Sequence, residues 1–240
     1  MDEPIVRRLA VAVLTYDRPE LLRSTLLDLC ASDVPVGWCR DVLIVDNSES
    51  LAGKLAADDA LEHGLADACR HMVYNVGIAA GWNQAWQYVN DVGVNGFFEG
   101  PPDVVALIQD DVKLDPDWFS ECLAALDYWP DLAVVSGYNS PKHETLERRA
   151  HGNLRLYTKV ALPGVHLVAK RAFWEGVFPI VSVEHHTGED WWFTKYSPGA
   201  PCNIGKVCGV VPGLVRHVGV ESTWNPTPHP EYVDPVAEAL

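Results

Sequence analysis

Two adjacent carboxylates, Asp110 and Asp111, follow the apolar run 105–108 (VALI), with only Gln109 between. Like charges at this range repel each other, and each carboxylate resists losing its hydration. Either bulk water or a bound divalent cation could offset the repulsion. Carboxylates are the ligands that Mg²⁺ and Mn²⁺ prefer, and such a cation can stabilise a diphosphate as a leaving group. The pair alone leaves a solvated strand end and a metal site equally open.

A second acidic pair, Glu189 and Asp190, lies beside two tryptophans in the sequence GEDWWF. A carboxylate next to aromatic side chains could act as a general base. The alternative is the first turn of a helix, where the helix dipole favours acidic residues, and for this motif alone that alternative is the stronger. Trp191 and Trp192 are either core residues or a wall on which a sugar could stack.

Histidine supplies one further candidate ligand. His217 follows an apolar segment, in the sequence RHVG, and it could bind a metal only if the carboxylate pair lies near it in space. His185 and His186 have no partner at metal-ligand spacing, so we interpret them as loop residues.

Strand and helix patterns alternate along the first half of the chain. Apolar runs predict strands at 9–15, 41–46, 71–75, 104–108 and 132–136. Helical spacing of apolar residues predicts helices after Asp17, over 78–89 and after Asp115. Asp17 could be the N-cap of the first of these helices, with Glu20 at N3 in a capping-box pattern. This alternation is typical of a doubly wound parallel sheet, in which right-handed crossovers bring the carboxyl ends of the strands to one edge. Ligands bind at that edge.

Polar residues follow four of the predicted strands directly. They are Thr15, Tyr16 and Asp17 after the first, Asp46, Asn47 and Ser48 after the second, Asn75 at the end of the third, and Asp110 and Asp111 after the fourth. Each cluster could be ordinary turn chemistry. Four clusters at one edge indicate a ligand site. Neither a G-x-G-x-x-G after the first strand nor a G-x-x-x-x-G-K-[ST] occurs, so a Rossmann dinucleotide site and a P-loop are not supported.

The second half of the chain has a different pattern. Residues 139–157 are polar and charged and predict a loop or flap, whereas 160–169 and 207–218 are mixed apolar segments. The Pro-rich last residues predict an extended tail.

Composition limits the classes of protein to which the chain can belong. Of its 240 residues 48% are hydrophobic and 21% charged, an ordinary globular composition. Lys plus Arg number 18 and Asp plus Glu 33, and the net charge of −15 disfavours nucleic acid as a partner without excluding a local basic cleft. The N-terminus lacks a secretory pattern, no apolar run is long enough to span a bilayer, and the six cysteines form no C-x-x-C pair. We therefore expect a cytoplasmic protein with reduced thiols.

In chain order, seven segments resemble the GT-A-type glycosyltransferases, in particular their large inverting family 2. The segments are VAVLTYDRPELLRSTLLDL, VLIVDNSES, NVGIAAGWNQAW, VALIQDDVKLDPDWF, GVHLVAKRAF, GEDWWF and RHVGVEST. The resemblance extends from about Leu9 to about Thr223. It implies one Rossmann-like GT-A domain, with a nucleotide-sugar-binding half at about 9–136, a smaller mixed acceptor-side half at about 137–223 and a tail at 224–240.

The resemblance also implies an activity, namely metal-dependent, inverting transfer of a sugar from a nucleoside-diphosphate sugar to an acceptor hydroxyl. The donor would by default be a UDP-sugar. The nucleotide-sugar would contact Thr15, Tyr16, Asp17, Asp46, Asn75, Gly77, Asn83, Gln109 and Asp110. Mn²⁺ or Mg²⁺ would be held by Asp111 and His217, with Asp110 beside them. The acceptor, which could be a glycan, a protein, a lipid-linked sugar or a modified nucleobase, would face Trp191, Trp192 and His166.

Catalysis would need a base, and the resemblance favours Asp190 over its neighbour Glu189. One departure from the family pattern matters: Gln109 is an amide where the fullest D-x-D motif has a carboxylate. It keeps open a non-catalytic relative that only binds a nucleotide or sugar. A sugar-phosphate nucleotidyltransferase is less consistent with the sequence, because the first strand is not followed by a Gly-rich loop bearing Arg or Lys.

Overall fold

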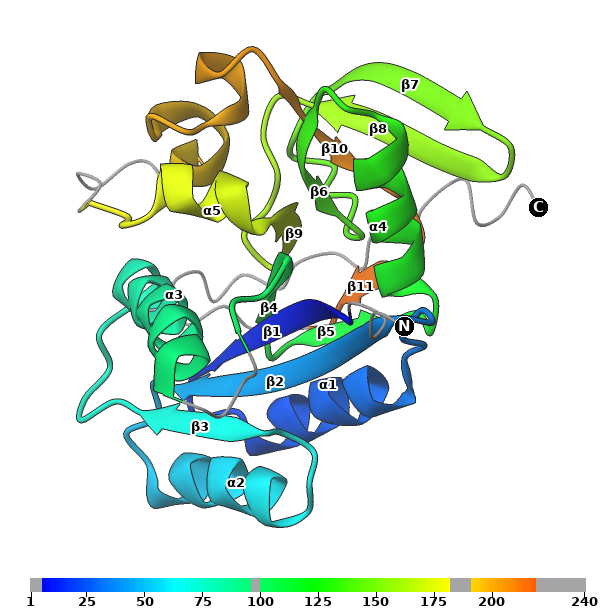
Figure 1. Cartoon of the computed structure of the whole chain (residues 1–240). Helices are drawn as coiled ribbons and strands as arrows, with labels where there is room; N and C mark the ends of the chain where they lie inside the picture. Colours follow the sequence, from blue (N-terminus) through cyan, green and yellow to red (C-terminus); the bar gives the residue numbers. More distant parts are fainter. Residues whose placement is uncertain (1–5, 96–99, 182–190, 219–240) are drawn as a thin grey trace.

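A computed structural model describes residues 6–95, 100–181 and 191–218 of the chain. It contains a nine-stranded sheet in the order β3-β2-β1-β4-β9-β6-β10-β8-β7 and a separate two-stranded sheet of β11 and β5 (Figure 1). The strands are β1 (Arg7–Thr15), β2 (Trp38–Asp46), β3 (Ala68–His71), β4 (Val104–Gln109), β5 (Val112–Leu114), β6 (Leu132–Ser136), β7 (Thr145–His151), β8 (Leu154–Lys159), β9 (His166–Lys170), β10 (Val207–Val210) and β11 (Val215–His217). The helices are α1 (Pro19–Ala31), α2 (Leu51–Glu62), α3 (Ile78–Asn95), α4 (Trp118–Tyr128) and α5 (Arg171–Val177), with a π-helical turn at Trp192–Tyr196 and a 3₁₀ turn at Pro201–Asn203.

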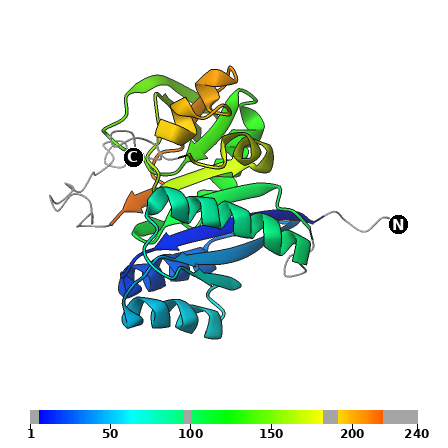
Figure 2. The same ribbon diagram turned by 90° about the vertical axis from the view of Figure 1, so that its left-hand side faces the viewer.

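The first half of the sheet is parallel, as predicted. Strand β1 pairs in parallel with β2 and β4, and β2 pairs in parallel with β3. Helices α1 and α2 cover one face and α3 the other, as Figures 1 and 2 show. Alternate residues of β1 therefore enter different cores: Val11 packs in the cluster that contains α1, and Ala12 in the cluster that contains α3. Burial on both faces explains why these strands are continuous apolar runs.

The second half of the sheet is mixed. Strand β9 runs antiparallel between β4 and β6, β10 is parallel to β6, and β8 and β7 extend the sheet antiparallel. The expectation of a loop at 139–157 was wrong, because much of this segment is the β7–β8 hairpin. Strand β7 is an edge strand whose side chains are mostly exposed on both faces, so its sequence TLERRAH has no apolar alternation. Charged side chains are common on such edges.

Other boundaries also differ from the prediction. The third strand ends at His71 instead of spanning 71–75, and Asn75 lies in the loop that follows. Helix α1 begins at Pro19, but its N-cap residue is Arg18, which makes no side-chain cap; the predicted cap by Asp17 was wrong. No helix in the described residues combines the length and apolar character needed to cross a bilayer.

Candidate functional site

The ends of β1, β2 and β4 lie at one level of the sheet, and we call them the carboxyl edge. Thr15 is paired in register with Asp46, and Leu14 with Gln109. The backbone N–H of Asp110 donates to the carbonyl of Leu14 at 3.1 Å, so the first residue after β4 is still hydrogen-bonded to β1. Parallel pairing thus brings together polar residues far apart in sequence, as the sequence predicted.

Asp110 lies within the protein, under the carboxyl edge. Its side chain is fully buried, and the hydroxyl of Thr15 donates to Asp110 Oδ2 at 2.6 Å. Burial raises the pKa of Asp110 to about 7; the Arg18 charge opposes this rise and the Asp111 charge adds to it. The hydroxyl of Thr25 on α1 lies 2.8 Å from the Asp110 carbonyl oxygen, which fixes the backbone of the pair.

Arg18 bridges the two carboxylates. Its Nη2 lies 2.7 Å from Asp110 Oδ1, and its Nη1 lies 2.6 Å from Asp111 Oδ2. His217 Nε2 lies 3.1 Å from the same Asp111 oxygen. Burial alone would raise the pKa of Asp111, but the contacts with His217 and Arg18 outweigh it and hold that pKa below its ordinary value. The Arg18 guanidinium therefore offsets the repulsion between the two carboxylates. From the sequence alone, water or a metal ion was expected in that role.

His217 reaches Asp111 through the two-stranded sheet. In the antiparallel ladder of β11 and β5, His217 is paired with Val112, and the Val218 N–H donates to the Asp111 carbonyl at 2.8 Å. The predicted proximity of His217 to the carboxylate pair is thus present in the structure. Both strands are only three residues long, too short to leave a periodic pattern in the sequence.

The site fits a divalent cation only in part. Asp111 Oδ1 is buried and accepts no hydrogen bond within the described residues, and His217 adds a nitrogen ligand. Two side-chain ligands suit Mg²⁺ or Mn²⁺ when substrate phosphates complete the coordination. Over residues 6–95, 100–181 and 191–218, however, no three Asp, Glu, His or Cys side chains gather as metal ligands. Arg18 also occupies the space between the carboxylates.

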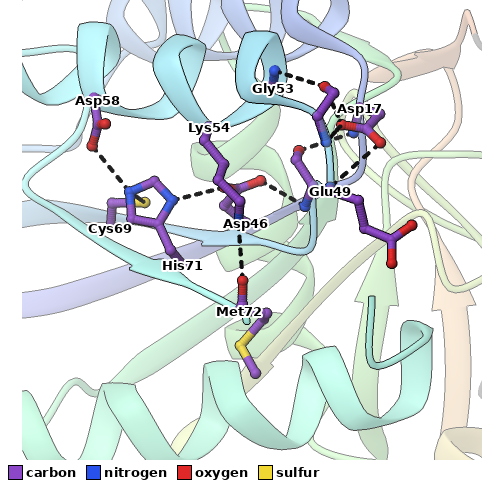
Figure 3. Close-up of polar contacts among 11 residues, drawn as sticks. Asp17, Asp46, Glu49, Gly53, Lys54, Asp58, Cys69, His71 and Met72 are labelled. Atoms are coloured by element: carbon purple, nitrogen blue, oxygen red, sulfur yellow. Dashed lines mark hydrogen bonds and ion pairs between the residues drawn. The ribbon is translucent and has the colours of Figure 1, made fainter. Parts of the chain in front are cut away.

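Asp46 points into a network on the α2 side of the sheet (Figure 3). It is fully buried; its Oδ1 accepts from Ser48 N at 2.9 Å and its Oδ2 contacts His71 Nδ1 at 2.7 Å. His71 Nε2 lies 3.0 Å from Asp58 Oδ1 and 3.6 Å from Cys69 Sγ. The structure thus places the Asp46 carboxylate against His71 instead of at the surface where a nucleoside could contact it directly.

The pKa of His71 leads to a prediction. Burial alone would lower that pKa, but the hydrogen bonds and charges of Asp46 and Asp58 raise it above its ordinary value of 6.5. Because the folded protein then binds the proton more tightly, the stabilisation is complete below about pH 6.5 and is lost as the pH rises through the raised pKa. His71→Gln should therefore lower the free energy of unfolding more at about pH 5.5 than at about pH 9.

Urea unfolding of the wild type and His71→Gln at both pH values measures this difference. His63→Gln is the control, because His63 Nδ1 contacts a backbone carbonyl, that of Asp59, instead of a carboxylate. A loss of stability for His71→Gln that stays constant between the two pH values would contradict a charged imidazole between Asp46 and Asp58.

Asp17 holds the start of α2, which is also visible in Figure 3. It has a positive φ of 51°, and its Oδ1 accepts a hydrogen bond from the backbone N–H of Ser50 at 2.9 Å and another from the Ser50 hydroxyl. Ser50 is the N-cap of α2 and accepts from Gly53 N at 3.1 Å. Burial alone would raise the pKa of Asp17, but the bonds from Ser50 and Glu49 lower it overall. The Asp17 carboxylate therefore connects two loops of the carboxyl edge.

Replacing this carboxylate should destabilise the fold. We expect Asp17→Ala to lower the free energy of unfolding by about 1–2 kcal/mol, as for the loss of a helix cap. Urea denaturation checks the value, with Asp59→Ala as the control because Asp59 is an exposed residue of the same helix. Equal losses for the two variants would show that the Asp17 bonds add no stability.

Three other predicted edge residues have structural contacts. Asn75 Oδ1 accepts from the N–H of Gly77 at 2.9 Å, and Gly77 has a φ of 78°, which favours glycine. The Asn83 side-chain amide donates to the carbonyl of Ile180 at 2.8 Å and accepts from its N–H at 2.7 Å. Asn83 lines a hollow of about 360 Å³ between α3 and the Phe178-Pro179 segment. Its amide is therefore used by the backbone and is not presented at the carboxyl edge.

The residues expected to face an acceptor do not form one group. His166 is fully buried, accepts from Gly137 N at 3.1 Å and packs edge-on against Trp118; burial lowers its pKa to about 3. Its assignment to the acceptor side is corrected, because it is a core residue. Trp192 donates from its ring nitrogen to the Val177 carbonyl at 2.8 Å, and Trp191 lies beside His143 and Lys195. Glu189 and Asp190 lie outside the described residues.

Two residues near the carboxyl edge were missed by sequence reasoning. Arg18 directly follows Asp17, and it is the basic residue closest in sequence to the end of β1. His71 ends β3 in register with Asp46. In both cases the local signal was a charged or ionisable residue at the end of a strand or within three residues of it.

No protein-family model matches this sequence, and no curated protein matches it either. Solved structures do match the fold. They include a mannosyltransferase, PcManGT from Pyrobaculum calidifontis, in complex with GDP-Man and Mn²⁺ (17% identity, 88% of this chain and 56% of that one, TM-score 0.60). S. aureus TarS matches at 14% identity over 89% of this chain and 37% of its own, with a TM-score of 0.60. GalNAc-T7 with UDP, GalNAc and Mn²⁺ matches at 14% identity over 94% and 47%, with a TM-score of 0.63.

These likenesses show the fold. The chain has the α/β, Rossmann-like GT-A fold that its sequence segments resemble. It spans between about a third and somewhat more than half of the length of the solved structures that it matches.

Proposed function

We propose that this chain transfers a glycosyl group from a nucleoside-diphosphate sugar to an acceptor hydroxyl, with a divalent cation and with inversion at the anomeric carbon. The observation that carries the proposal is the Asp110–Asp111 pair after β4, with Thr15 on one side and His217 on the other. The solved structures of PcManGT and GalNAc-T7, which share the fold, hold a nucleotide or nucleotide-sugar together with Mn²⁺, which supports a donor of that class.

Each side chain has a defined task in this proposal. Asp111 and His217 would hold Mn²⁺ or Mg²⁺, and the bound cation would neutralise the departing diphosphate. Thr15 donates a hydrogen bond to Asp110 and so orients that carboxylate. Asp46 and Asp17 act as positioning residues for the loops after β2 and β1, because their oxygens accept hydrogen bonds from those loops or from His71.

The remaining expectations concern the donor and the acceptor. Tyr16 and Gln109 lie at the carboxyl edge, Asn75 and Gly77 lie in the loop between β3 and α3, and all four would line the nucleoside and ribose. Asp190 would remove the proton from the acceptor hydroxyl, because an inverting transfer needs one base and no protein nucleophile. Holding donor and acceptor in line and stabilising the leaving group would supply most of the rate.

A thermal-shift series tests the proposal. Nucleoside diphosphates and UDP-, GDP- and dTDP-sugars are added in the presence of Mn²⁺ and, separately, of EDTA. A ligand that binds only the native protein raises its melting temperature. We expect at least one nucleotide-sugar to raise it with Mn²⁺ and to lose most of that effect in EDTA. The absence of any shift across the series would contradict a nucleotide-sugar site.

A second candidate is a non-catalytic nucleotide-sugar-binding protein. Two observations favour it: Gln109 replaces a carboxylate of the D-x-D pattern, and Arg18 neutralises the two carboxylates that remain. Release of nucleoside diphosphate from a bound donor separates the two functions, because a transferase hydrolyses its donor slowly even without an acceptor. Binding without any metal-dependent release would favour the non-catalytic protein.

A further inference from the structure

Arg18 has an unusual position for a residue of the loop between β1 and α1. Its two terminal nitrogens are divided between two carboxylates, at 2.7 Å from Asp110 and 2.6 Å from Asp111, and about a quarter of its side chain is exposed. The oxygen of Asp111 that it contacts is also the one that His217 contacts. The guanidinium therefore stands where the two carboxylates and the histidine converge.

The hydrogen-bonding capacity of this arrangement is not fully used. Arg18 Nε and Asp111 Oδ1 are both buried, and neither has a hydrogen-bond partner within the described part of the chain. A guanidinium binds most completely when two parallel N–H groups meet one carboxylate, but here the fork is divided between two. Arg18 thus balances the charge of the pair while it leaves donor and acceptor atoms unmatched, and a buried unmatched atom costs free energy.

We propose that Arg18 is a built-in counter-cation that occupies the divalent-cation position of the Asp110–Asp111 pair and must leave before a metal can bind there. A bound Mg²⁺ would lie about 2.1 Å from its carboxylate oxygen, and Asp111 Oδ2 already has Arg18 Nη1 at 2.6 Å. A doubly charged cation and a guanidinium at that separation would also repel each other strongly in a partly buried site. The two occupants therefore exclude each other.

This inference rests on the cation of the proposed function and adds a consequence for binding. Metal binding must replace the ion pairs of Arg18, so the metal alone should bind weakly to the wild type. The released guanidinium is exposed at the same edge, where a diphosphate offers it a planar pair of anionic oxygens. Arg18 would then exchange the carboxylates for the phosphates as donor and metal enter together.

The test measures Mn²⁺ binding alone, without any donor, by calorimetry and by the electron paramagnetic resonance of free Mn²⁺. Arg18→Gln should bind Mn²⁺ about tenfold more tightly than the wild type or better, because the competing charged hydrogen bonds are gone. The melting temperature of Arg18→Gln without metal should fall, since two buried carboxylates then face each other. Mn²⁺ should raise the melting temperature of this variant by more than it raises that of the wild type. The double variant Arg18→Gln with Asp111→Asn should lose the gain in affinity.

Arg8→Gln is the matched control. Arg8 Nη2 forms a similarly half-buried ion pair with Asp41 at 2.9 Å, near the opposite end of β1. This variant should lose stability and keep the wild-type Mn²⁺ affinity. If Arg18→Gln does not fold, Arg18→Lys, which keeps the charge without the fork, should show an intermediate gain.

Mn²⁺ affinity in Arg18→Gln or Arg18→Lys that is equal to or weaker than that of the wild type would overturn the proposal. That result would not contradict the proposed glycosyl transfer, because donor turnover with metal is measured separately in the wild type. Conversely, tighter Mn²⁺ binding in the variant without any donor-dependent signal in the wild type would support Arg18 as counter-cation and contradict the proposed transfer.

Discussion

Asp190→Asn is expected to lower turnover by about 10²–10⁴-fold, the usual cost of losing a general base. The affinity for the donor should stay nearly unchanged, because the proposed base would contact the acceptor hydroxyl and not the diphosphate. The amide keeps the size of the side chain and removes its negative charge and its ability to accept a proton. Turnover with one working acceptor and calorimetric donor affinity, measured on the same preparation, check both parts of this prediction.

Glu189→Gln is the natural comparison for this variant. It changes the adjacent carboxylate in the same way, and its effect on turnover should be the milder of the two. If Glu189→Gln is inactive and Asp190→Asn is active, Glu189 is the general base and Asp190 is not. Full activity in both variants would mean that the base lies elsewhere in the chain.

Asp111→Asn is expected to remove metal-dependent donor binding, with a loss of affinity of roughly a hundredfold or more. Substitutions one shell further from a metal already cost about 10–100-fold, and Asp111 would be a direct ligand. The amide occupies the same space, but it loses the charge that Arg18 and His217 contact at 2.6 Å and 3.1 Å. Calorimetry of a nucleotide-sugar with Mn²⁺ and with EDTA measures the metal-dependent part of the binding free energy.

Asp41→Asn is the control for this experiment, because it also takes a carboxylate from an arginine, Arg8, in a half-buried ion pair. It should weaken the fold and leave donor binding unchanged. Far-UV circular dichroism confirms that both variants are folded. Unchanged nucleotide-sugar affinity of Asp111→Asn in Mn²⁺ would show that no cation joins the donor to this carboxylate.

The buried parallel strands could be predicted because burial on two faces leaves a strong signal. The apolar runs at β1, β2, β4 and β6 match strands within three residues at each end, and each is covered on both sides or lies deep in the sheet. Strand β7 could not be predicted, because neither face of this exposed edge strand is buried, so its sequence is charged and shows no apolar alternation. Strand β3 was misplaced toward His71–Asn75, since its own sequence, ACRH, has only four residues and no apolar run.

The location of the candidate site and the proximity of His217 to Asp111 were predictable, whereas the contacts of Arg18 and Asp17 were not. Residues that follow strands must gather at the carboxyl edge, which is a matter of topology and can be read from the chain order. Which side chain meets which carboxylate depends on geometry across long separations: Arg18 lies 93 residues from Asp111. Local patterns likewise predicted that Asp17 caps α1, whereas in the folded chain its carboxylate accepts a hydrogen bond from Ser50 at the start of α2.

The pairing of β11 with β5 also bears on the order in which the protein folds. His217 and Asp111 are 217 − 111 = 106 residues apart, and the single β11–β5 ladder of three residue pairs brings them together. Contacts at such separation carry the entropic cost of closing a long loop, so they form late, after the intervening chain is ordered. Strands β1, β2 and β3 can pair from neighbouring segments before that point, whereas the pairing of β1 with β4 closes a loop of similar length. We therefore expect the contact between Asp111 and His217 to form late, together with the β1–β4 pairing, so that a cation held by both side chains would stabilise the folded protein and not a partly folded chain.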